Sequence, residues 1–195
     1  MNESKTKAVI KKEKIVEAAL SIIKKKGLSG VTMEEIGAEM KLTKGSLYYY
    51  FKNKADLIYE CHRHVLSKGM EEFESISAKH QDIFVILKKM VDSHLDNAIN
   101  EKEAFNLLMS PKDFFAGEQL HAIYELRNRY ESYFTAIFER GAEEGVFKTK
   151  DLVIARLFIM GGLNWIQQWY NPEGRLTIDE IKDFYYEYIL MILRG

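Results

Sequence analysis

The chain has one cysteine and two prolines among its 195 residues, and both scarcities narrow the choice of fold. Cys61 has no second cysteine with which to form an intrachain disulfide, which suits a reducing compartment, so we expect a cytoplasmic protein. Away from Pro111 and Pro172, long uninterrupted helices are permitted. No signal peptide and no run of 18 apolar residues is apparent, so we expect neither export nor membrane insertion.

The alternation of apolar and polar residues that is typical of β-strands is also missing. Apolar residues instead recur three and four positions apart, which is the period of an α-helix. Hydrophobic residues make up 47% of the chain, enough for a sizeable core. The sequence therefore predicts an all-α fold of about nine helices, which we expect to divide into residues 1–54 and 55–195.

Arginine is absent from residues 1–54, but this segment holds 12 lysines and only 6 glutamates, a net charge of +6. The rest of the chain carries −7, so the overall charge of −1 hides a basic N-terminal part on an acidic body. Such a division suits a protein whose basic part meets nucleic-acid phosphates. The alternative is a lysine-rich surface that is merely solvated.

The segment 31–54 has the signals of two short helices joined by a tight turn. Thr32 and Glu35 have the spacing of a capping box at the start of the first helix. Thr43 is a good N-cap for the second. Only residues 40–42 remain for the turn, which is the length expected of a helix-turn-helix.

The second of these helices is expected to pack through Leu47 and Phe51, four residues apart on one face. Its other faces carry small, hydroxylated, basic and aromatic side chains, which suits an element that enters a DNA major groove. Three consecutive tyrosines, at 48–50, point in three directions, so they cannot all belong to the core.

These residues resemble the DNA-binding domain of the tetracycline-repressor (TetR) family. The matching pieces are Met33-Glu-Glu-Ile36, Lys44-Gly-Ser-Leu-Tyr48, Tyr50-Phe51 and Asn53-Lys54, followed by Leu57. The family usually has glycine where this turn has Lys41. We therefore expect a lysine at positive φ, at a cost of roughly 1 kcal/mol.

The resemblance implies that residues 1–54 form a three-helix domain that binds DNA. It implies base and groove contacts by the second helix of the motif and phosphate contacts by Thr32, Thr43, Tyr50 and Lys54. The full set of predicted DNA-binding residues is Thr32, Thr43, Lys44, Gly45, Ser46, Tyr48, Tyr49, Tyr50 and Lys54. Lys11, Lys12 and Lys14, near the expected start of the first helix at about Lys11, could also reach the DNA backbone.

Residues 55–195 are expected to form a helical ligand-binding and dimerisation domain. An apolar stripe predicts a helix over about 83–98, made of Ile83, Leu87, Met90, Val91, His94, Leu95 and Ala98. Another helix is expected over about 119–144, and Asp151 is the expected N-cap of one over about 151–170. A last helix begins with a capping box at Thr177 and Glu180. That last helix is apolar almost all round and must be buried. Burial against a second subunit is the simplest solution, and TetR-like proteins dimerise through their last two helices.

The stretch 161–176 is similar to the C-terminal domain of TetR regulators that respond to acyl-CoA in lipid and steroid catabolism. This similarity implies an acyl-CoA effector, with arginines such as Arg127 and Arg129 near the CoA phosphates and Phe114 among the wall residues. The predicted ligand-binding residues are Met90, His94, Phe105, Leu108, Met109, Phe115, Tyr124, Arg127, Asn164, Trp165 and Trp169. Any of them could instead be core, and the two tryptophans could instead pack at a dimer interface.

Several other functions have weaker support. Cys61 and His64 share a helix face, but two ligands are too few for a zinc site. Because no nucleophile elbow, phosphate loop or metal triad is apparent, we expect no enzyme, no catalytic residue, no metal and no cofactor. The main hypothesis is a homodimeric repressor that binds a palindromic operator and is released by a hydrophobic effector. A multidrug sensor and a ligand-free architectural DNA-binding protein are the alternatives.

Overall fold

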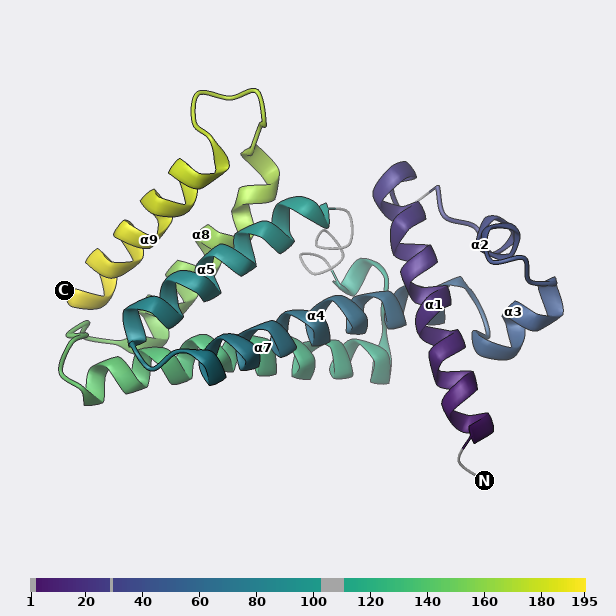
Figure 1. Cartoon of the computed structure of the whole chain (residues 1–195), viewed down its shortest axis with the longest axis horizontal. Coiled ribbons are helices and arrows are strands. Elements are labelled where there is room, and N and C mark those ends of the chain that lie inside the picture. Colours follow the sequence, from purple (N-terminus) through teal and green to yellow (C-terminus); the bar gives the residue numbers. More distant parts are fainter. Residues whose placement is uncertain (1–2, 29, 103–110) are drawn as a thin grey trace. The chain divides into compact units, whose positions relative to one another are not determined.

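The computed structural model describes residues 3–28, 30–102 and 111–195, with the backbone alone for residues 3–7 and 113. These residues form helices and connecting turns and contain no strand, so the expected all-α fold is confirmed (Figure 1). The elements are α1 (Glu3–Lys26), α2 (Met33–Glu39), α3 (Lys44–Tyr50), α4 (Lys54–Lys79), α5 (Ile83–Asn100), the 3-10 helix η1 (Pro111–Asp113), α7 (Gly117–Glu143), α8 (Leu152–Trp169) and α9 (Ile178–Arg194).

The chain forms two compact units. The first, unit 1, comprises residues 1–65 and 101–124, and the second, unit 2, comprises residues 66–100 and 125–195. The helices α4 and α7 each contribute one part to each unit. The functional division into a DNA-binding part, 1–54, and a ligand-binding part, 55–195, stays a prediction.

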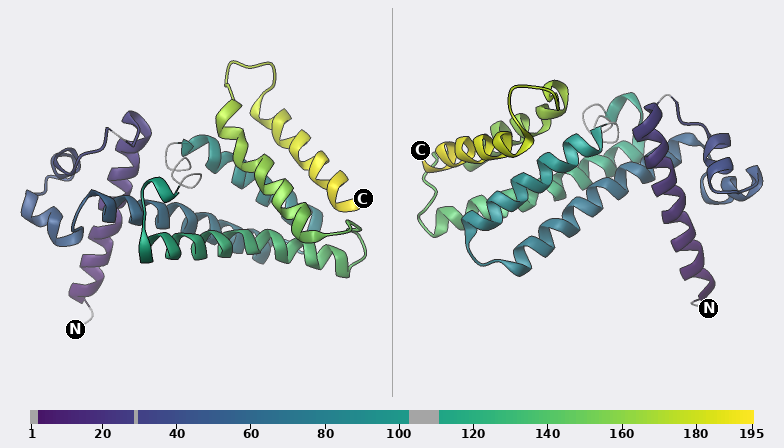
Figure 2. Two further views of the ribbon diagram at one scale, coloured as in Figure 1. Left: turned by 180° about the vertical axis from the view of Figure 1, so that it is seen from behind. Right: turned by 45° about the horizontal axis from the view of Figure 1, so that its top comes forward.

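The core of unit 1 contains the apolar positions that the helix period indicates. On α1, Ile15, Ala19 and Ile23 are fully buried. On the other side of this core, the expected anchor of α3 is confirmed, because Leu47 is 0% exposed and Phe51, its C-cap, is 2% exposed. The views in Figure 2 show α2 and α3 as two short helices connected by a tight turn beside α1.

The start of α1 was expected at about Lys11, and this is wrong, because the helix begins at Glu3. The sequence of residues 3–7 holds no apolar residue, and Val9 and Ile10 are exposed. The apolar period therefore cannot predict a helix before Lys11. A helix that nucleates further along the chain can still extend back through these residues, because their helix propensity is adequate.

The turn between α2 and α3 is a Schellman motif, the common helix ending in which two N–H groups bond back to the last turn. The N–H of Lys41 donates to the carbonyl of Ala38 at 3.1 Å, and the N–H of Leu42 donates to that of Gly37 at 2.8 Å. This geometry requires a left-handed residue, and Lys41 has φ 51°. The predicted non-glycine residue at positive φ is confirmed.

Lys41→Gly should therefore raise the free energy of unfolding of unit 1 by up to about 1 kcal/mol, because glycine adopts this conformation without strain. Urea titration followed by circular dichroism measures the change. Lys52→Gly, at an exposed position outside the turn, is the control. A destabilised Lys41→Gly variant would contradict the strain at this turn.

In unit 2, α5, α8 and α9 pack against one another. The predicted stripe of α5 is confirmed, since Ile83, Leu87, Met90, Val91, His94, Leu95 and Ala98 are all buried. Asp151 caps α8 by accepting from the N–H groups of Val153 and Ile154 at 2.9 and 3.0 Å, as expected. The predicted capping box of Thr177 and Glu180 starts α9.

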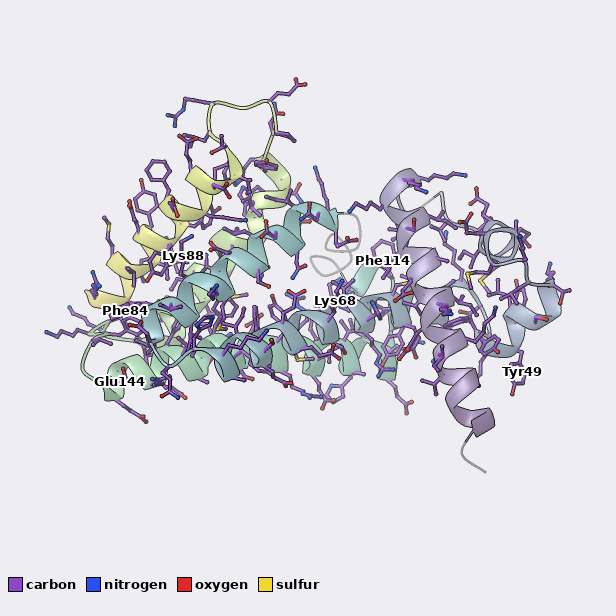
Figure 3. All side chains as sticks on the ribbon, in the orientation of Figure 1. Tyr49, Lys68, Phe84, Lys88, Phe114 and Glu144 are labelled. Atoms are coloured by element: carbon purple, nitrogen blue, oxygen red, sulfur yellow. The ribbon has the colours of Figure 1, made fainter. Side chains whose placement is uncertain are left out.

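Ion pairs fix α9 on α5. Lys88 of α5 lies 3.1 Å from Asp183 of α9, and Lys182 of α9 lies 2.7 Å from Asp96 of α5. The guanidinium of Arg194 lies over the ring of Phe84. Figure 3 labels Phe84 and Lys88 on α5. Among the described residues, no helix is long and apolar enough to span a bilayer.

Candidate DNA interface and ligand site

The start of α3 is fixed by two hydroxyl groups. Thr43 Oγ1 accepts from the N–H of Ser46 at 3.2 Å and lies 2.9 Å from Ser46 Oγ. Both side chains stay exposed. The first turn of α3 therefore presents two mutually oriented hydroxyls, which can exchange their internal hydrogen bond for one to a phosphate or a base edge.

The outward face of α3 carries most of the predicted DNA-binding residues. Tyr49 is 80% exposed and Tyr48 is 40% exposed, and Figure 3 shows Tyr49 directed away from the helices of unit 1. Tyr50 is half-buried, with its ring edge-on to Tyr49 at a centroid distance of 5.2 Å. Lys44, 3.5 Å from Glu34, is 74% exposed. Solvent thus reaches a basic, hydroxylated and aromatic surface.

Gly45, on the same face, has no heavy atom within 4 Å of the position that a Cβ would occupy. Packing within the chain therefore does not require glycine here, and glycine in a helix costs about 1 kcal/mol relative to alanine. A close approach of the backbone to another molecule would explain a glycine at this position.

Only one of the two hydrogen bonds of the expected capping box forms at the start of α2. Thr32 Oγ1 accepts from the N–H of Glu35 at 3.1 Å, as expected. The carboxylate of Glu35, however, accepts from Lys26 Nζ at 2.5 Å and from Thr32 Oγ1 at 3.3 Å. The hydrogen bond from Lys26 holds the pKa of the Glu35 carboxyl below its ordinary value. Local spacing could not reveal this partner, because Lys26 belongs to the preceding helix.

Lys54 is the first residue of α4, where the sequence motif places it. Asn53 caps this helix by accepting from the N–H of Asp56 at 2.8 Å. The ammonium of Lys54 donates to the carbonyl of Leu28 at 3.2 Å. This bond connects the start of α4 to the turn that follows α1. An ammonium has three donors, so this bond leaves capacity for a phosphate.

In unit 2, two predicted ligand-binding residues lie together in a buried polar cluster. The Nδ1 atom of His94 on α5 lies 3.0 Å from the hydroxyl of Tyr130 on α7. The side chain of Asn164 on α8 also interacts with His94. Burial lowers the pKa of the His94 imidazole to about 4, and the interaction with Asn164 opposes part of this change. The cluster is therefore neutral at physiological pH.

The lowered pKa of His94 predicts a dependence of stability on pH. Above pH 6.5 the imidazole is neutral in both states, whereas between pH 6.5 and about 4 only the unfolded chain takes up the proton. Stability should thus fall with falling pH across this window, by up to about 1.4 kcal/mol per pH unit. Urea titrations of wild type and His94→Gln at pH 7.5, 6.0 and 5.0 should show a smaller loss in the variant. Parallel losses would contradict the assignment.

Tyr130 was not predicted from the sequence. Its ring packs on α4 at Gly69, where a Cβ would lie 2.7 Å from Tyr130 Cε2. It also contacts Phe73, at a centroid distance of 4.9 Å. Nothing in the spacing along α7 separates this tyrosine from its neighbours. Only the glycine on α4, 61 positions away in the chain, could have hinted at a bulky partner.

Two further predicted ligand-binding residues lie one helical turn from members of this cluster. Met90 is buried on α5, four residues before His94, and Arg127 is half-buried on α7, three residues before Tyr130. Phe115 belongs to the core of unit 1, with ring contacts to Tyr59 and His62 at 6.0 and 5.8 Å, and Tyr124 is half-buried in the same unit. Phe105, Leu108 and Met109 lie outside the described residues.

The hairpin of α8 and α9 exposes a continuous set of large apolar side chains. We call this set, together with Gly161, the hairpin face. Phe158 is 72% exposed and Trp165 is 57% exposed. A groove of about 440 Å³ between the helices is lined on α9 by Phe184 and Tyr188, among others, and on α8 by Trp169. The exposed members of the hairpin face are Val153, Ile154, Leu157, Phe158, Trp165 and Trp169 of α8 and Phe184, Tyr188 and Met191 of α9.

The possible metal ligands in the sequence do not form a site within the described part of the chain. No group of three His, Cys, Asp or Glu side chains lies close enough there to hold an ion. Cys61 is buried, and burial raises the pKa of its thiol to about 12. A thiol so far from ionisation is a poor metal ligand and nucleophile at neutral pH.

The tight turn, the caps and the exposed face of α3 define a helix-turn-helix protein. Two family models cover most of the chain: "Bacterial regulatory proteins, tetR family" matches residues 15–61, and "Tetracyclin repressor-like, C-terminal domain" matches residues 86–193. The chain belongs to the TetR family of transcriptional regulators. Because this family consists of regulators, the prediction that the chain is not an enzyme is confirmed.

Individual relatives are distant but match along nearly the whole chain. The HTH-type transcriptional repressor KstR2 of Rhodococcus jostii is 22% identical over 187 residues, covering 95% of this chain and 90% of the relative. A TetR/AcrR-family regulator from Thermobifida fusca has a TM-score of 0.79 at 22% identity, covering 92% and 96%. AibR, in complex with isovaleryl coenzyme A and operator DNA, has a TM-score of 0.75 at 22% identity, covering 94% and 98%. At such identities the structural likeness establishes the fold.

Proposed function

We propose that the chain is a homodimeric transcriptional repressor that binds a palindromic operator through α3 and is released by a hydrophobic effector, an acyl-CoA. The observation that carries the proposal is the exposed face of α3 in a chain of this family. A repressor of this kind acts in the cytoplasm, where bacterial DNA lies.

The DNA contacts would be divided by chemistry. Lys44, Ser46, Tyr48 and Tyr49 would contact base edges and groove walls from the face of α3. Thr32, Thr43, Tyr50 and Lys54 would hold phosphates and so fix the register of the protein on the duplex. Gly45, in the same turn of α3 as Lys44, would let the backbone approach the DNA closely.

Gly45→Ala separates DNA binding from folding. A methyl group at this position meets no atom of the chain, so the variant should be as stable as wild type or more stable by up to about 1 kcal/mol. Its affinity for operator DNA should nevertheless fall by about tenfold, because the methyl group would hold α3 away from the groove. Thermal melting and fluorescence anisotropy measure the two properties, and unchanged affinity would contradict the close approach at Gly45.

The hairpin face supports the proposed homodimer. Its large apolar side chains are exposed on two helices that pack against each other, and some of them line one groove. A large exposed apolar surface is typical of an interaction site. Gly161 is exposed on α8, and no heavy atom lies within 4 Å of the position that a Cβ would occupy. Packing within the chain therefore does not require glycine at this position either. A helix of a second copy, packed closely at Gly161, would explain both features.

The ligand proposal depends on the cluster of His94, Tyr130 and Asn164. A neutral imidazole, a phenol and an amide within an apolar helical unit can hydrogen-bond an uncharged acceptor, such as a thioester carbonyl. The similar protein AibR, whose crystal structure is a complex with isovaleryl coenzyme A and operator DNA, supports the choice of an acyl-CoA. Another hydrophobic molecule with one polar group would suit the same cluster and is the competing candidate.

Native mass spectrometry of the protein with acetyl-, isovaleryl-, octanoyl- and palmitoyl-CoA tests the effector. The proposal predicts a dimer that takes up one acyl-CoA per subunit with a preference for one chain length. Asn164→Leu, which keeps the size of the side chain but removes its polar group, should bind at least about tenfold more weakly. A dimer that takes up none of the four would overturn the acyl-CoA assignment. An assay of operator release by uncharged hydrophobic compounds would then test the competitor.

A further inference from the structure

Unit 1 contains a hollow of its own, of about 440 Å³, at the start of α4. We propose that this hollow binds a small amphiphilic carboxylate and that the bound carboxylate competes with DNA phosphate for the ammonium of Lys54. The lining residues are Leu28, Lys54, Ala55, Ile58, Phe114 and Phe115. We call this cavity the Lys54 hollow. None of the residues of the polar cluster around His94 belongs to it.

The described residues of this lining combine an apolar surface with a single cation. Ile58 and Phe115 are buried, while Phe114 is 44% exposed. Small-molecule sites are typically apolar hollows of about 300–1,000 Å³ with a few polar groups that fix the orientation of the ligand. An apolar tail against the two phenylalanines would therefore leave its polar end at Lys54.

The charge of Lys54 selects the polar end. Among the ion pairs found within the described residues, none includes Lys54, whose ammonium donates to the Leu28 carbonyl at 3.2 Å. The nearby carboxylate of Asp56 accepts from the side-chain amide of Gln119 at 3.0 Å. Among the described residues, this half-buried ammonium bonds to a neutral carbonyl. It would gain from an anionic partner, since a charge-assisted hydrogen bond is about twice as strong as a neutral one.

A free carboxylic acid suits the hollow better than an acyl-CoA does. The hollow offers one cation, whereas the several phosphates of coenzyme A would need more than one. An aliphatic acid matches the described part of the lining, which consists of five apolar residues and one lysine. The proposed ligand class is therefore chemically distinct from the effector proposed for unit 2.

The consequence for regulation rests on the proposed phosphate contact of Lys54. One ammonium cannot neutralise a carboxylate in the hollow and a DNA phosphate at the same time. The carboxylate should therefore lower the affinity for DNA, and DNA should lower the affinity for the carboxylate by the same factor. Because a phosphate contact is independent of sequence, any duplex can report the competition.

Isothermal titration of the DNA-free protein with decanoate, below its micellar concentration, tests the site, with decanol as the uncharged match. Wild type should bind decanoate at least about tenfold more tightly than decanol. Lys54→Met should lose this preference, and Lys54→Arg should retain it. Ala55→Trp, which fills the hollow but keeps the cation, should lose binding of both compounds. Lys52→Met, at an exposed neighbouring lysine, is the control and should bind as wild type does.

Absence of binding by wild type would overturn the proposal, as would decanoate binding that Lys54→Met and Ala55→Trp leave unchanged. Fluorescence anisotropy with a DNA duplex then tests the competition. Decanoate should weaken DNA binding by wild type but not by Lys54→Met. If Lys54→Met binds DNA as tightly as wild type, the phosphate contact and the competition are both wrong, while the titration without DNA still decides whether the site exists.

Discussion

Phe158→Glu is expected to separate the protein into monomers and to lower its affinity for a palindromic operator by about 100-fold or more. Phe158 is 72% exposed at the centre of the apolar surface of α8, and a carboxylate there would have to be desolvated against a second copy. Loss of the dimer removes the second half-site contact, and linking two binding modules typically raises affinity by about 10²–10⁴. Analytical ultracentrifugation and anisotropy measure the two effects.

Val85→Glu is the matched control for this substitution. Val85 is also an exposed apolar residue of unit 2, at 39%, but it lies on α5, outside the hairpin face. The control should remain dimeric and bind the operator as wild type does. If Phe158→Glu remained a dimer, the subunits would associate through another surface and the assignment of the hairpin face would be wrong.

Gly141→Ala is expected to cost about 3 kcal/mol of unfolding free energy, which makes it the largest single effect on stability that we predict. A Cβ at this position would lie 2.0 Å from Cδ2 and 2.3 Å from Cε2 of the Phe147 ring, and Phe147 is only 3% exposed. The ring cannot rotate away into solvent without loss of its burial. The backbone here is also fixed, because the N–H groups of Val146 and Phe147 both donate to the carbonyl of Gly141 at 2.9 Å.

A double-mutant cycle tests the cause of this loss. Phe147→Leu removes the ring atoms that the new methyl group would meet, so Gly141→Ala should cost less in that background than in wild type. The coupling energy should be about 1–2 kcal/mol, in the range of residues in direct contact. Urea titrations of wild type, the two single variants and the double variant measure this coupling energy. Additive costs would show that the Phe147 ring is not what excludes a side chain at Gly141.

The parts of the fold that could be predicted from the sequence depend on local physics. The caps at Asp151 and Thr177 and the buried stripe of α5 involve residues within one helix, where spacing alone determines which groups meet. The turn of the helix-turn-helix belongs to the same class, because its hydrogen bonds span only Gly37 to Leu42. The departure from the family at Lys41 likewise predicted a residue at positive φ, which the structure has.

The features that could not be predicted depend on partners far apart in the chain. Glu35 bonds to Lys26 of the preceding helix, although its spacing to Thr32 indicated a reciprocal capping box. Tyr130 meets its partners Gly69 and His94 only through the packing of α4, α5 and α7. Phe115 packs against Tyr59 in unit 1, a contact that its spacing along the chain could not reveal. Helical periodicity identifies which residues are buried, but not which residues they meet.

The structure assigns different chemistry to the two units. Unit 1 combines an exposed, basic and aromatic α3 with a cation at the edge of a hollow, which suits contacts with anions. Unit 2 combines a neutral buried polar cluster with the hairpin face, which suits an uncharged ligand group and a second subunit. The proposed repressor needs all of these features, but each can be disrupted by a substitution that leaves the others intact.

The most direct test of the central claim is the selection of DNA from a pool of random duplexes by the wild-type protein, followed by sequencing. The account predicts a single enriched motif made of two inverted half-sites, since a two-fold dimer places one α3 in each of two major grooves. Gly45→Ala should enrich the same motif more weakly. Recovery of the pool without enrichment, or of an asymmetric single site, would contradict a homodimeric operator-binding repressor.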